Sequence, residues 1–254
     1  MNGGRLKNLQ YPCRTCPLRA NPVFRDFTKT ELDFVERFKT GELTAAAQSV
    51  ILREGAASAH LYTVLSGVGF RYKSLPDGGR QILNFVFPGD LIGLQGAVAR
   101  EMQHSVEALT DVILCVFERE RIWKLYESYP SLAFDITWLA SREERFLDEH
   151  LLNVGRRSAL KRIAYLVVHL HTRVVALRMN RVQARHEVIE VPLTQQHIAD
   201  ALGLSLVHTN KSLRKLERMG LIGWSQRMMV LPDLSRLKAL ADWDHEGETI
   251  RPLI

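Results

Sequence analysis

The spacing of apolar and polar residues changes along the chain, and each change predicts a different kind of element. In residues 28–39, Leu32, Phe34, Val35 and Phe38 recur at helical spacing. A period near 3.6 residues predicts a short helix with one apolar face that packs against the rest of the protein.

Residues 48–117 follow another pattern, in which short apolar runs are separated by glycine-containing segments. One separator, Ser74-Leu75-Pro76-Asp77-Gly78-Gly79, is typical of a tight turn between two strands. Several short strands at this spacing predict an antiparallel sandwich or jelly-roll barrel.

The helical period returns after Pro130 and predicts a helix at about residues 131–152. Its apolar positions are Leu132, Phe134, Ile136, Trp138, Leu139, Phe146, Leu147 and Leu151. They cover more of the circumference than a one-sided surface helix needs, so we expect one side to pack on its own domain and the other, with Leu139 and Phe146, on a partner subunit. Gly155 to Ser158 predicts a break followed by an N-cap, and a further helix over residues 158–174.

Residues 192–231 have the pattern of a winged helix-turn-helix. Thr194 is a candidate N-cap for a helix that contains Ile198, Ala199 and Leu202. Gly203 lies where a tight turn between two helices needs a residue that tolerates positive φ. Ser205 can cap the second helix, and residues 220–231 predict a short two-stranded wing.

The second helix is predicted to have a buried and an exposed face. Leu206, Thr209, Leu213 and Leu216 form the predicted apolar face, opposite Val207, His208, Asn210, Lys211 and Arg214. Small polar groups followed by amides and cations suit entry into a DNA major groove. The predicted DNA-contacting residues are therefore Thr194, Gln195, Ser205, Leu206, Val207, His208, Asn210, Lys211 and Arg214.

The distribution of charge agrees with a nucleic-acid partner. Of the formal net charge of +6, residues 155–230 contribute 13 Lys and Arg against 4 Asp and Glu, a net of +9. Residues 1–154 contribute −1 and residues 231–254 contribute −2. A local excess of cations is what binding to phosphates requires, although a solvated basic surface has the same composition.

Composition also bears on the cellular location. The chain has no apolar run of the roughly 18–20 residues that a membrane span needs, and its first residues lack the apolar core of a secretory signal. Three cysteines do not make a disulfide framework in 254 residues. We therefore expect a cytoplasmic protein without a membrane partner.

With these elements in order, residues 10–235 resemble the CRP/FNR superfamily of bacterial transcription regulators. The resemblance rests on the strand signature Phe87-Pro88-Gly89-Asp90-Leu91-Ile92-Gly93, on the long helix and on the helix-turn-helix. It implies an α+β fold with an N-terminal β-roll of the cyclic-nucleotide-binding type, a dimerisation helix and a C-terminal winged helix-turn-helix. It also implies a homodimer that binds palindromic double-stranded DNA and contacts RNA polymerase.

The predicted domain organisation follows from this resemblance and from the breaks in the pattern. We expect a cysteine-containing segment at residues 1–27, a sensory roll at 28–130, the dimerisation helix at 131–154, the DNA-binding domain at 155–235 and a tail at 236–254.

Two departures from the family pattern concern the effector. Members that bind cyclic nucleotides carry a Glu shortly after the signature glycine and an Arg-Ser pair further on, whereas this chain has Leu94 and Gln103-His104-Ser105. A buried cyclic phosphate without its arginine would be an uncompensated charge, so we expect no cyclic AMP effector.

The resemblance to oxygen-sensing members concerns the cysteines. Cys13, Cys16 and Cys115 match positions that hold a [4Fe–4S] cluster in those members, but the third N-terminal cysteine is absent and Asp26 is the only acidic residue nearby. The alternatives are a buried free thiol at Cys115 and a redox or incidental pair at Cys13 and Cys16.

The second predicted helix also departs from the oxygen-sensor pattern. The Glu, Ser and Arg that those members place toward the bases correspond here to Val207, Asn210 and Lys211. We therefore expect a different operator sequence.

Two other classes of protein remain as alternatives to a DNA-binding regulator. One is a cupin-like small-molecule-binding or enzymatic domain with an accessory helical module. Cupins gather His and Glu on neighbouring strands, whereas His60 and His104 are isolated, so we do not expect an enzyme. The other is an interaction protein whose helix-turn-helix no longer binds DNA.

Overall fold

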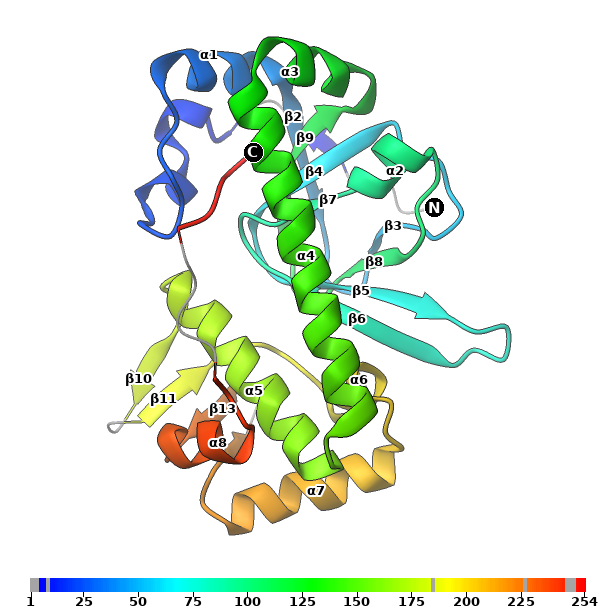
Figure 1. Ribbon diagram of the computed structural model, residues 1–254, viewed down its shortest axis with the longest axis vertical. Helices are drawn as coiled ribbons and strands as arrows, with labels where there is room; N and C mark the ends of the chain where they lie inside the picture. Colours follow the sequence, from blue (N-terminus) through cyan, green and yellow to red (C-terminus); the bar gives the residue numbers. More distant parts are fainter. Residues whose placement is uncertain (1–4, 8–9, 184–185, 226–227, 245–249) are drawn as a thin grey trace. The chain divides into compact units, whose positions relative to one another are not determined.

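The computed structural model describes residues 5–7, 10–183, 186–225, 228–244 and 250–254 (Figure 1). Contacts between residues divide the chain into two compact units. The first unit comprises Met1–Lys73, Asn84–Arg145 and Ile250–Ile254, and the second comprises Ser74–Leu83 and Phe146–Thr249. In the described residues, no helix is long and apolar enough to cross a membrane.

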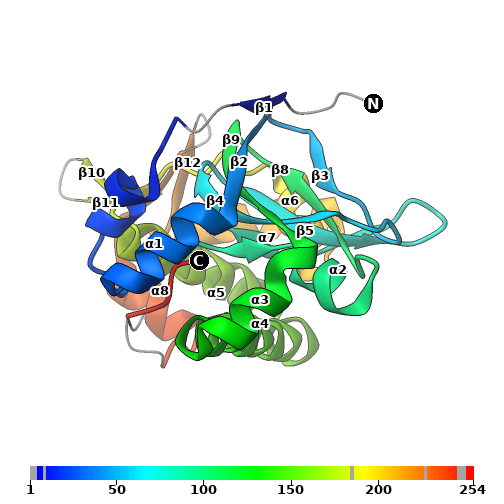
Figure 2. The same ribbon diagram turned by 90° about the horizontal axis from the view of Figure 1, so that it is seen from above.

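The first unit is built on two antiparallel sheets, which confirms the predicted roll (Figure 2). One sheet has the order β1 (Arg5–Lys7), β2 (Lys39–Ala45), β9 (Val112–Glu118), β4 (His60–Ser66) and β7 (Leu91–Ile92). The other has the order β3 (Val50–Leu52), β8 (Ser105–Ala108), β5 (Gly69–Ser74) and β6 (Arg80–Val86). Apolar residues of both sheets form one core, made of Leu52, Tyr62, Val64, Val86, Ile92, Met102, Val106, Ala108, Val112, Leu114 and Val116.

Short helices complete the first unit. They are η1 (Cys13–Thr15), η2 (Pro17–Ala20), α1 (Lys29–Phe38), α2 (Leu94–Ala99), η3 (Arg119–Arg121) and α3 (Ile122–Ser128). The helix predicted over residues 28–39 is α1, and its four predicted apolar residues are all buried. Thr28 and Glu31 form a reciprocal capping box that satisfies two free N–H groups and fixes where α1 begins.

Two glycines of the signature segment, one before β7 and one directly after it, have left-handed conformations. Gly89 has a φ of +84° and Gly93 a φ of +90°, in the left-handed region that other residues rarely adopt. A Cβ at Gly89 would also overlap the ring of Phe24. Asp90 lies between the two glycines, is buried, and accepts a hydrogen bond from the Phe87 N–H at 2.9 Å through Oδ2.

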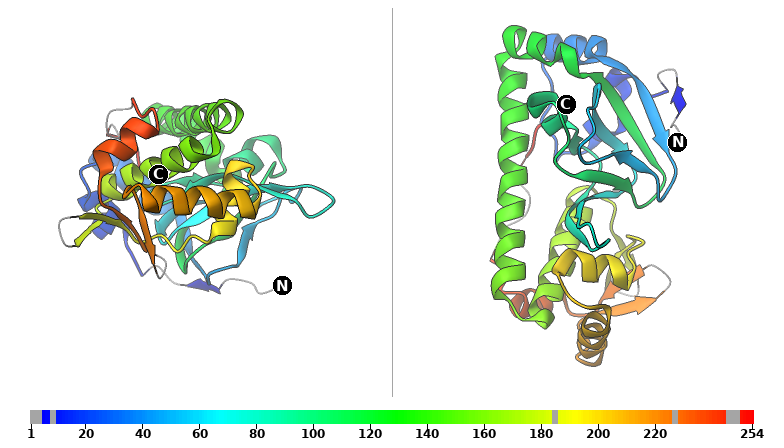
Figure 3. Two further views of the ribbon diagram at one scale, coloured as in Figure 1. Left: turned by 90° about the horizontal axis from the view of Figure 1, so that it is seen from below. Right: turned by 90° about the vertical axis from the view of Figure 1, so that its right-hand side faces the viewer.

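The predicted long helix is α4 (Pro130–Arg156), which runs without interruption for 27 residues (Figure 3, right). The break predicted over residues 155–158 is confirmed, although Gly155 and Arg156 are still helical: α4 ends at Arg156, and Ser158 is the N-cap of the next helix. One glycine near a helix end costs only about 1 kcal/mol relative to alanine.

The second unit contains α5 (Ala159–Ala176), α6 (Gln195–Leu202), α7 (Leu206–Arg218) and α8 (Leu234–Leu240). Its four-stranded antiparallel sheet has the order β10 (Arg181–Gln183), β11 (His186–Ile189), β13 (Met228–Leu231) and β12 (Gly223–Ser225). The predicted wing corresponds to β12 and β13. Strands β10 and β11 extend it into a sheet that the sequence pattern did not reveal.

The segment predicted as a tail, residues 236–254, is not a plain tail. Helix α8 covers its beginning, and the apolar side chain of Leu237 is fully buried. Residues 251–254 are buried as well and belong to the first unit.

Candidate nucleic-acid interface

The turn between α6 and α7 is fixed by local hydrogen bonds of the predicted kind. Thr194 Oγ1 accepts from the His197 N–H at 3.1 Å, and His197 Nδ1 accepts from the Thr194 N–H at 3.1 Å. Gly203 ends α6 with a φ of +59°. Ser205 Oγ accepts from the His208 N–H at 3.2 Å, which starts α7. These caps set the two helices at a defined angle within the second unit.

The buried face of the helix pair holds α7 in place. Ile198, Ala199 and Leu202 of α6 are buried, as are Leu213 and Leu216 of α7. Helix α5 packs against α6 and α7 in the same unit (Figure 1). The opposite face of α7 therefore stays free for a ligand.

The exposed face of α7 differs from the prediction at two positions. Leu206 was predicted to be buried, but it is the first residue of the helix, before the packed turns, and is 42% exposed. With Val207, which is 79% exposed, it forms an apolar patch at the start of α7. Asn210 was predicted to be exposed, but it is half-buried, with its Oδ1 buried and without a hydrogen-bond partner in the described part of the chain.

The cations of α7 form one exposed stripe. Lys211 and Arg214 are exposed as predicted, and Lys215 and Arg218, which were not predicted to contact DNA, are exposed too. Lys215 is four residues from Lys211 and Arg218 is four residues from Arg214, and this spacing was the available signal, because residues four positions apart share a helix face. At the start of α6, Thr194 and Gln195 are exposed, as is Ser205 before α7.

The three predicted cysteines lie in one neighbourhood of the first unit. Cys13 is in η1, Cys16 follows it directly and Cys115 is in β9, and Cys13 and Cys16 both influence the pKa of Cys115. Burial raises the pKa of Cys115 to about 12 and that of Cys13 to about 11, and the nearby ammonium of Lys39 opposes both shifts only partly. Both thiols are therefore protonated at neutral pH.

Lys39 and Glu42, two of the charged residues that act on these cysteines, are already paired with each other. Lys39 Nζ lies 2.7 Å from Glu42 Oε1 and donates to the Tyr11 carbonyl at 2.8 Å. Glu42 also accepts from the N–H groups of Gln10 and Tyr11. The carboxylates that act on Cys13 are those of Glu36 and Glu42, whereas Asp26, the carboxylate considered from the sequence, is exposed. Within the described ranges, no three Cys, His, Asp or Glu side chains are grouped closely enough to hold a metal ion.

Helix α4 has both a buried and an exposed apolar side. Leu132, Ile136 and Leu139 are buried in the first unit. Phe146, which was expected to face a partner, instead packs within the second unit against the rings and cations of α5, with its centroid 5.1 Å from that of His169. The exposed large apolar residues of α4 are Phe134 (67%), Leu147 (40%), Leu151 (69%) and Leu152 (47%).

Comparison with known families gives two matches that together cover both units. Residues 42–129 match the cyclic nucleotide-binding domain family, and residues 161–240 match the Crp-like helix-turn-helix domain family. Both matches agree with the order of elements described above.

Individual relatives match over most of their length. The chain is 31% identical over 229 residues to the nitrogen fixation regulation protein FixK of Bradyrhizobium diazoefficiens, which covers 90% of this chain and 93% of that protein. It is 28% identical to the transcriptional activator protein FnrL of Cereibacter sphaeroides, over 92% of this chain and 94% of that protein. The structure of FixK2 from Bradyrhizobium japonicum superposes with a TM-score of 0.69 at 26% identity, over 78% of this chain and 96% of that one.

Proposed function

The chain belongs to the CRP/FNR family of transcription regulators, and we propose that it binds a palindromic operator in double-stranded DNA as a homodimer. The observation that carries this proposal is the capped helix α7, whose buried side is fixed and whose other side is an exposed stripe of cations. The relatives named above are regulators rather than enzymes, which favours this function over the cupin-like alternative.

The exposed apolar side of α4 supports the dimer. Phe134, Leu147, Leu151 and Leu152 leave large apolar side chains in solvent, and pairing with the same helix of a second copy would remove them from water. A two-fold axis along such a pair places two copies of α7 against two half-sites. Half-sites read by paired recognition helices lie about one helical turn, ~10 base pairs, apart.

Helix α7 enters the major groove with its exposed face toward the bases. Val207, His208 and Lys211 are exposed near the start of α7, where side chains of a recognition helix reach base edges. Asn210 is half-buried and lies at the border of this face, and it reaches the groove from that position. Arg214, Lys215 and Arg218 lie further along the helix and suit phosphate contacts.

A binding-site selection tests this docking. Lys211→Ala should cost about 1–3 kcal/mol and relax the preference at one symmetric base pair. Arg214→Ala should weaken binding to all sequences alike and reduce the salt slope by about one unit per subunit. Lys124→Ala is the matched control, because Lys124 is an exposed lysine of the first unit. If Lys211→Ala leaves both the selected motif and the affinity unchanged, α7 is not docked in this way.

The family resemblance supports RNA polymerase as a protein partner of the DNA-bound dimer. A pull-down of polymerase on operator DNA, with and without the regulator, measures this interaction. Equal recovery of polymerase in both samples would contradict it.

A response to redox state is the second function, and the shared neighbourhood of Cys13, Cys16 and Cys115 favours it. An iron–sulfur cluster at these residues does not fit the arrangement described, because in the described part of the chain their side chains are not grouped for a metal ion. We therefore propose that these residues respond as thiols, and that any cluster requires residues 13–16 to change position.

Anaerobic purification distinguishes the two forms of this response. A thiol sensor is colourless, and mild oxidation lowers its count of titratable thiols and changes its operator affinity. Cys115→Ser should leave that change intact if Cys13 and Cys16 pair with each other. Visible absorbance that bleaches in air, together with bound iron that Cys115→Ser loses, would show a cluster instead.

A further inference from the structure

The last described residues of the chain occupy a built site in the first unit. Arg251 pairs with Phe24 as a parallel β-bridge. The Arg251 N–H donates to the Val23 carbonyl at 2.8 Å, and the Arg25 N–H donates to the Arg251 carbonyl at 2.8 Å. Ile250 is 69% exposed, whereas residues 251–254 are buried. The burial therefore begins at Arg251.

The side chain of Arg251 is fully buried and has specific partners. Its Nη1 lies 2.8 Å from Asp90 Oδ1, its Nη2 donates to the Pro88 carbonyl at 2.7 Å, and its guanidinium lies 4.6 Å from the centre of the Phe24 ring. Its Nε is buried without a partner in the part of the chain that the structure describes. An arginine is almost never fully buried unless it is paired, because its charge loses hydration. A carboxylate, a carbonyl and an aromatic face together supply what an arginine head group needs.

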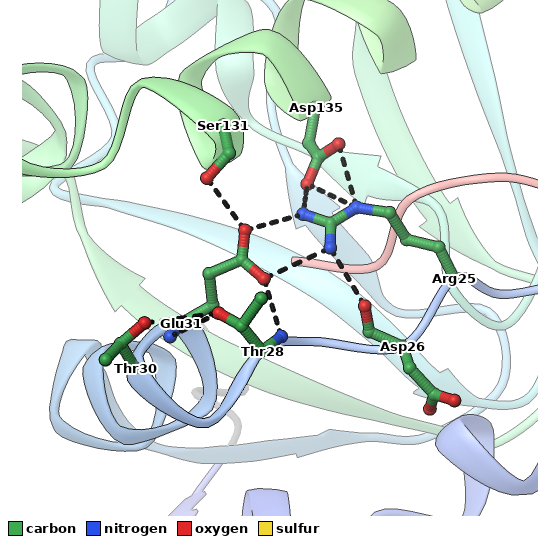
Figure 4. Close-up of polar contacts among 7 residues, drawn as sticks. All are labelled: Arg25, Asp26, Thr28, Thr30, Glu31, Ser131 and Asp135. Carbon is green, nitrogen blue, oxygen red and sulfur yellow. Dashed lines mark hydrogen bonds and ion pairs between the residues drawn. The ribbon is translucent and has the colours of Figure 1, made fainter.

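The walls of this site are held by contacts that do not involve the segment. Asp90 Oδ2 is fixed by the Phe87 N–H, and Arg142 of α4 approaches Asp90 Oδ1 at 3.4 Å. Arg25, whose N–H contacts the segment, is fixed by ion pairs to Asp135 and Glu31 (Figure 4). The site is thus organised by the first unit rather than by its occupant.

The far end of the segment is held by apolar contacts and one hydrogen bond. Leu253 and Ile254 are each 4% exposed, and Thr63 Oγ1 of β4 donates to the Ile254 main-chain oxygen. The site is therefore filled by an arginine followed by buried apolar residues.

We propose that residues 250–254 are a resident peptide ligand of the first unit, and that the site they fill is an exchangeable peptide-binding site. The ligand class is an extended peptide with an arginine followed by apolar residues. The preceding described residues, up to Asp244, belong to the second unit. A competing peptide of the same class would displace residues 250–254 from the site.

Binding of the peptide in trans tests the proposal independently of DNA. The protein shortened after residue 249 should bind a fluorescently labelled peptide of residues 250–254, measured by anisotropy. The full chain should bind the peptide about ten-fold more weakly or worse, because its own segment fills the site. The peptide with Arg251→Ala should lose about ten-fold or more, because the buried Asp90 carboxylate then lacks this partner. Asp90→Asn in the shortened protein should also weaken binding, whereas Glu120→Gln, at an exposed carboxylate, should not.

Loss of the segment could also unfold the protein, so a second variant keeps the test decisive. Replacing residues 245–249 with a protease site allows the intact chain to fold before it is cut. After cutting, the labelled peptide should exchange with the released segment while the circular dichroism spectrum stays unchanged. The proposal is overturned if the folded, cut protein binds neither peptide, or binds the wild-type and Arg251→Ala peptides equally well.

Discussion

At the scale of single residues, the Glu31 carboxylate shows how nearby donors stabilise a buried charge. Its carboxylate accepts hydrogen bonds from the Arg25 guanidinium, from the Thr28 N–H at 2.7 Å and from the Ser131 hydroxyl at 2.7 Å (Figure 4). Burial alone would raise the pKa of Glu31, but these donors outweigh it and lower the pKa from 4.5 to about 2. The charged form is therefore the one that stabilises the fold.

We predict an acid-dependent loss of stability from Glu31. Its folded-state pKa lies below the unfolded value, so its contribution is complete above about pH 4.5 and is lost as the pH falls toward 2. The size is on the order of 3 kcal/mol. Glu31→Gln should lower the free energy of unfolding at pH 7 by that order, and its difference from wild type should shrink in acid. Glu127→Gln, at an exposed carboxylate, is the control. Urea unfolding at several pH values measures the effect, and a pH-independent difference would contradict it.

Residues whose role depends on near neighbours could be predicted from the sequence, and those that depend on distant partners could not. The caps at Thr194 and Ser205 and the turn at Gly203 need only residues a few positions away. By contrast, Arg25 meets Asp135 across 110 positions, and Arg251 meets Asp90 across 161. No local pattern contains such pairs, because only the folded chain brings them together.

At the scale of elements, α4 shows what an apolar pattern can and cannot decide. The pattern predicted a long helix with an unusually wide apolar surface, and this is confirmed. It could not decide which apolar residues face the protein itself. Leu139 and Phe146 pack internally, whereas Leu147 and Leu151, one turn apart, are exposed.

We predict that charges at Leu147 and Leu151 disrupt the dimer. Leu147→Glu with Leu151→Glu should give monomers with unchanged helix content, because both side chains are exposed in the single chain. Like charges facing each other across a two-fold axis repel and remain in a poorly solvated interface. Analytical ultracentrifugation measures the oligomeric state. Val98→Glu with Trp123→Glu, at exposed apolar residues elsewhere, is the control, and a double α4 variant that stays dimeric would remove α4 as the interface.

The short elements that the sequence did not reveal share a physical cause. β10 and β11 contain only three and four residues, too few for a strand period to stand out. Their place in the sheet depends on pairing between β11 and β13, which are about forty residues apart. Such strands are stabilised by tertiary pairing rather than by local preference.

At the scale of the whole molecule, the class of fold and of function could be predicted from the sequence because several independent features agreed. The strand pattern, the long helix, the capped helix-turn-helix and the +9 charge of residues 155–230 all point to one kind of regulator. The division into units was harder to foresee, because residues 74–83, which include the first residues of β6, are grouped with the second unit, and the end of the chain is grouped with the first. Such assignments depend on packing between segments that are distant in sequence.

In the proposed complex, two copies of the chain read the two halves of a palindrome through α7. The most direct measurement is the affinity of the wild-type protein for its selected operator, compared with the same operator in which one half-site is scrambled. We expect a dimer on the intact site and a loss of about 10²-fold or more on the scrambled one, because each mismatched base pair costs about 1–3 kcal/mol. Equal affinity for both DNAs, with one subunit bound to each, would contradict it.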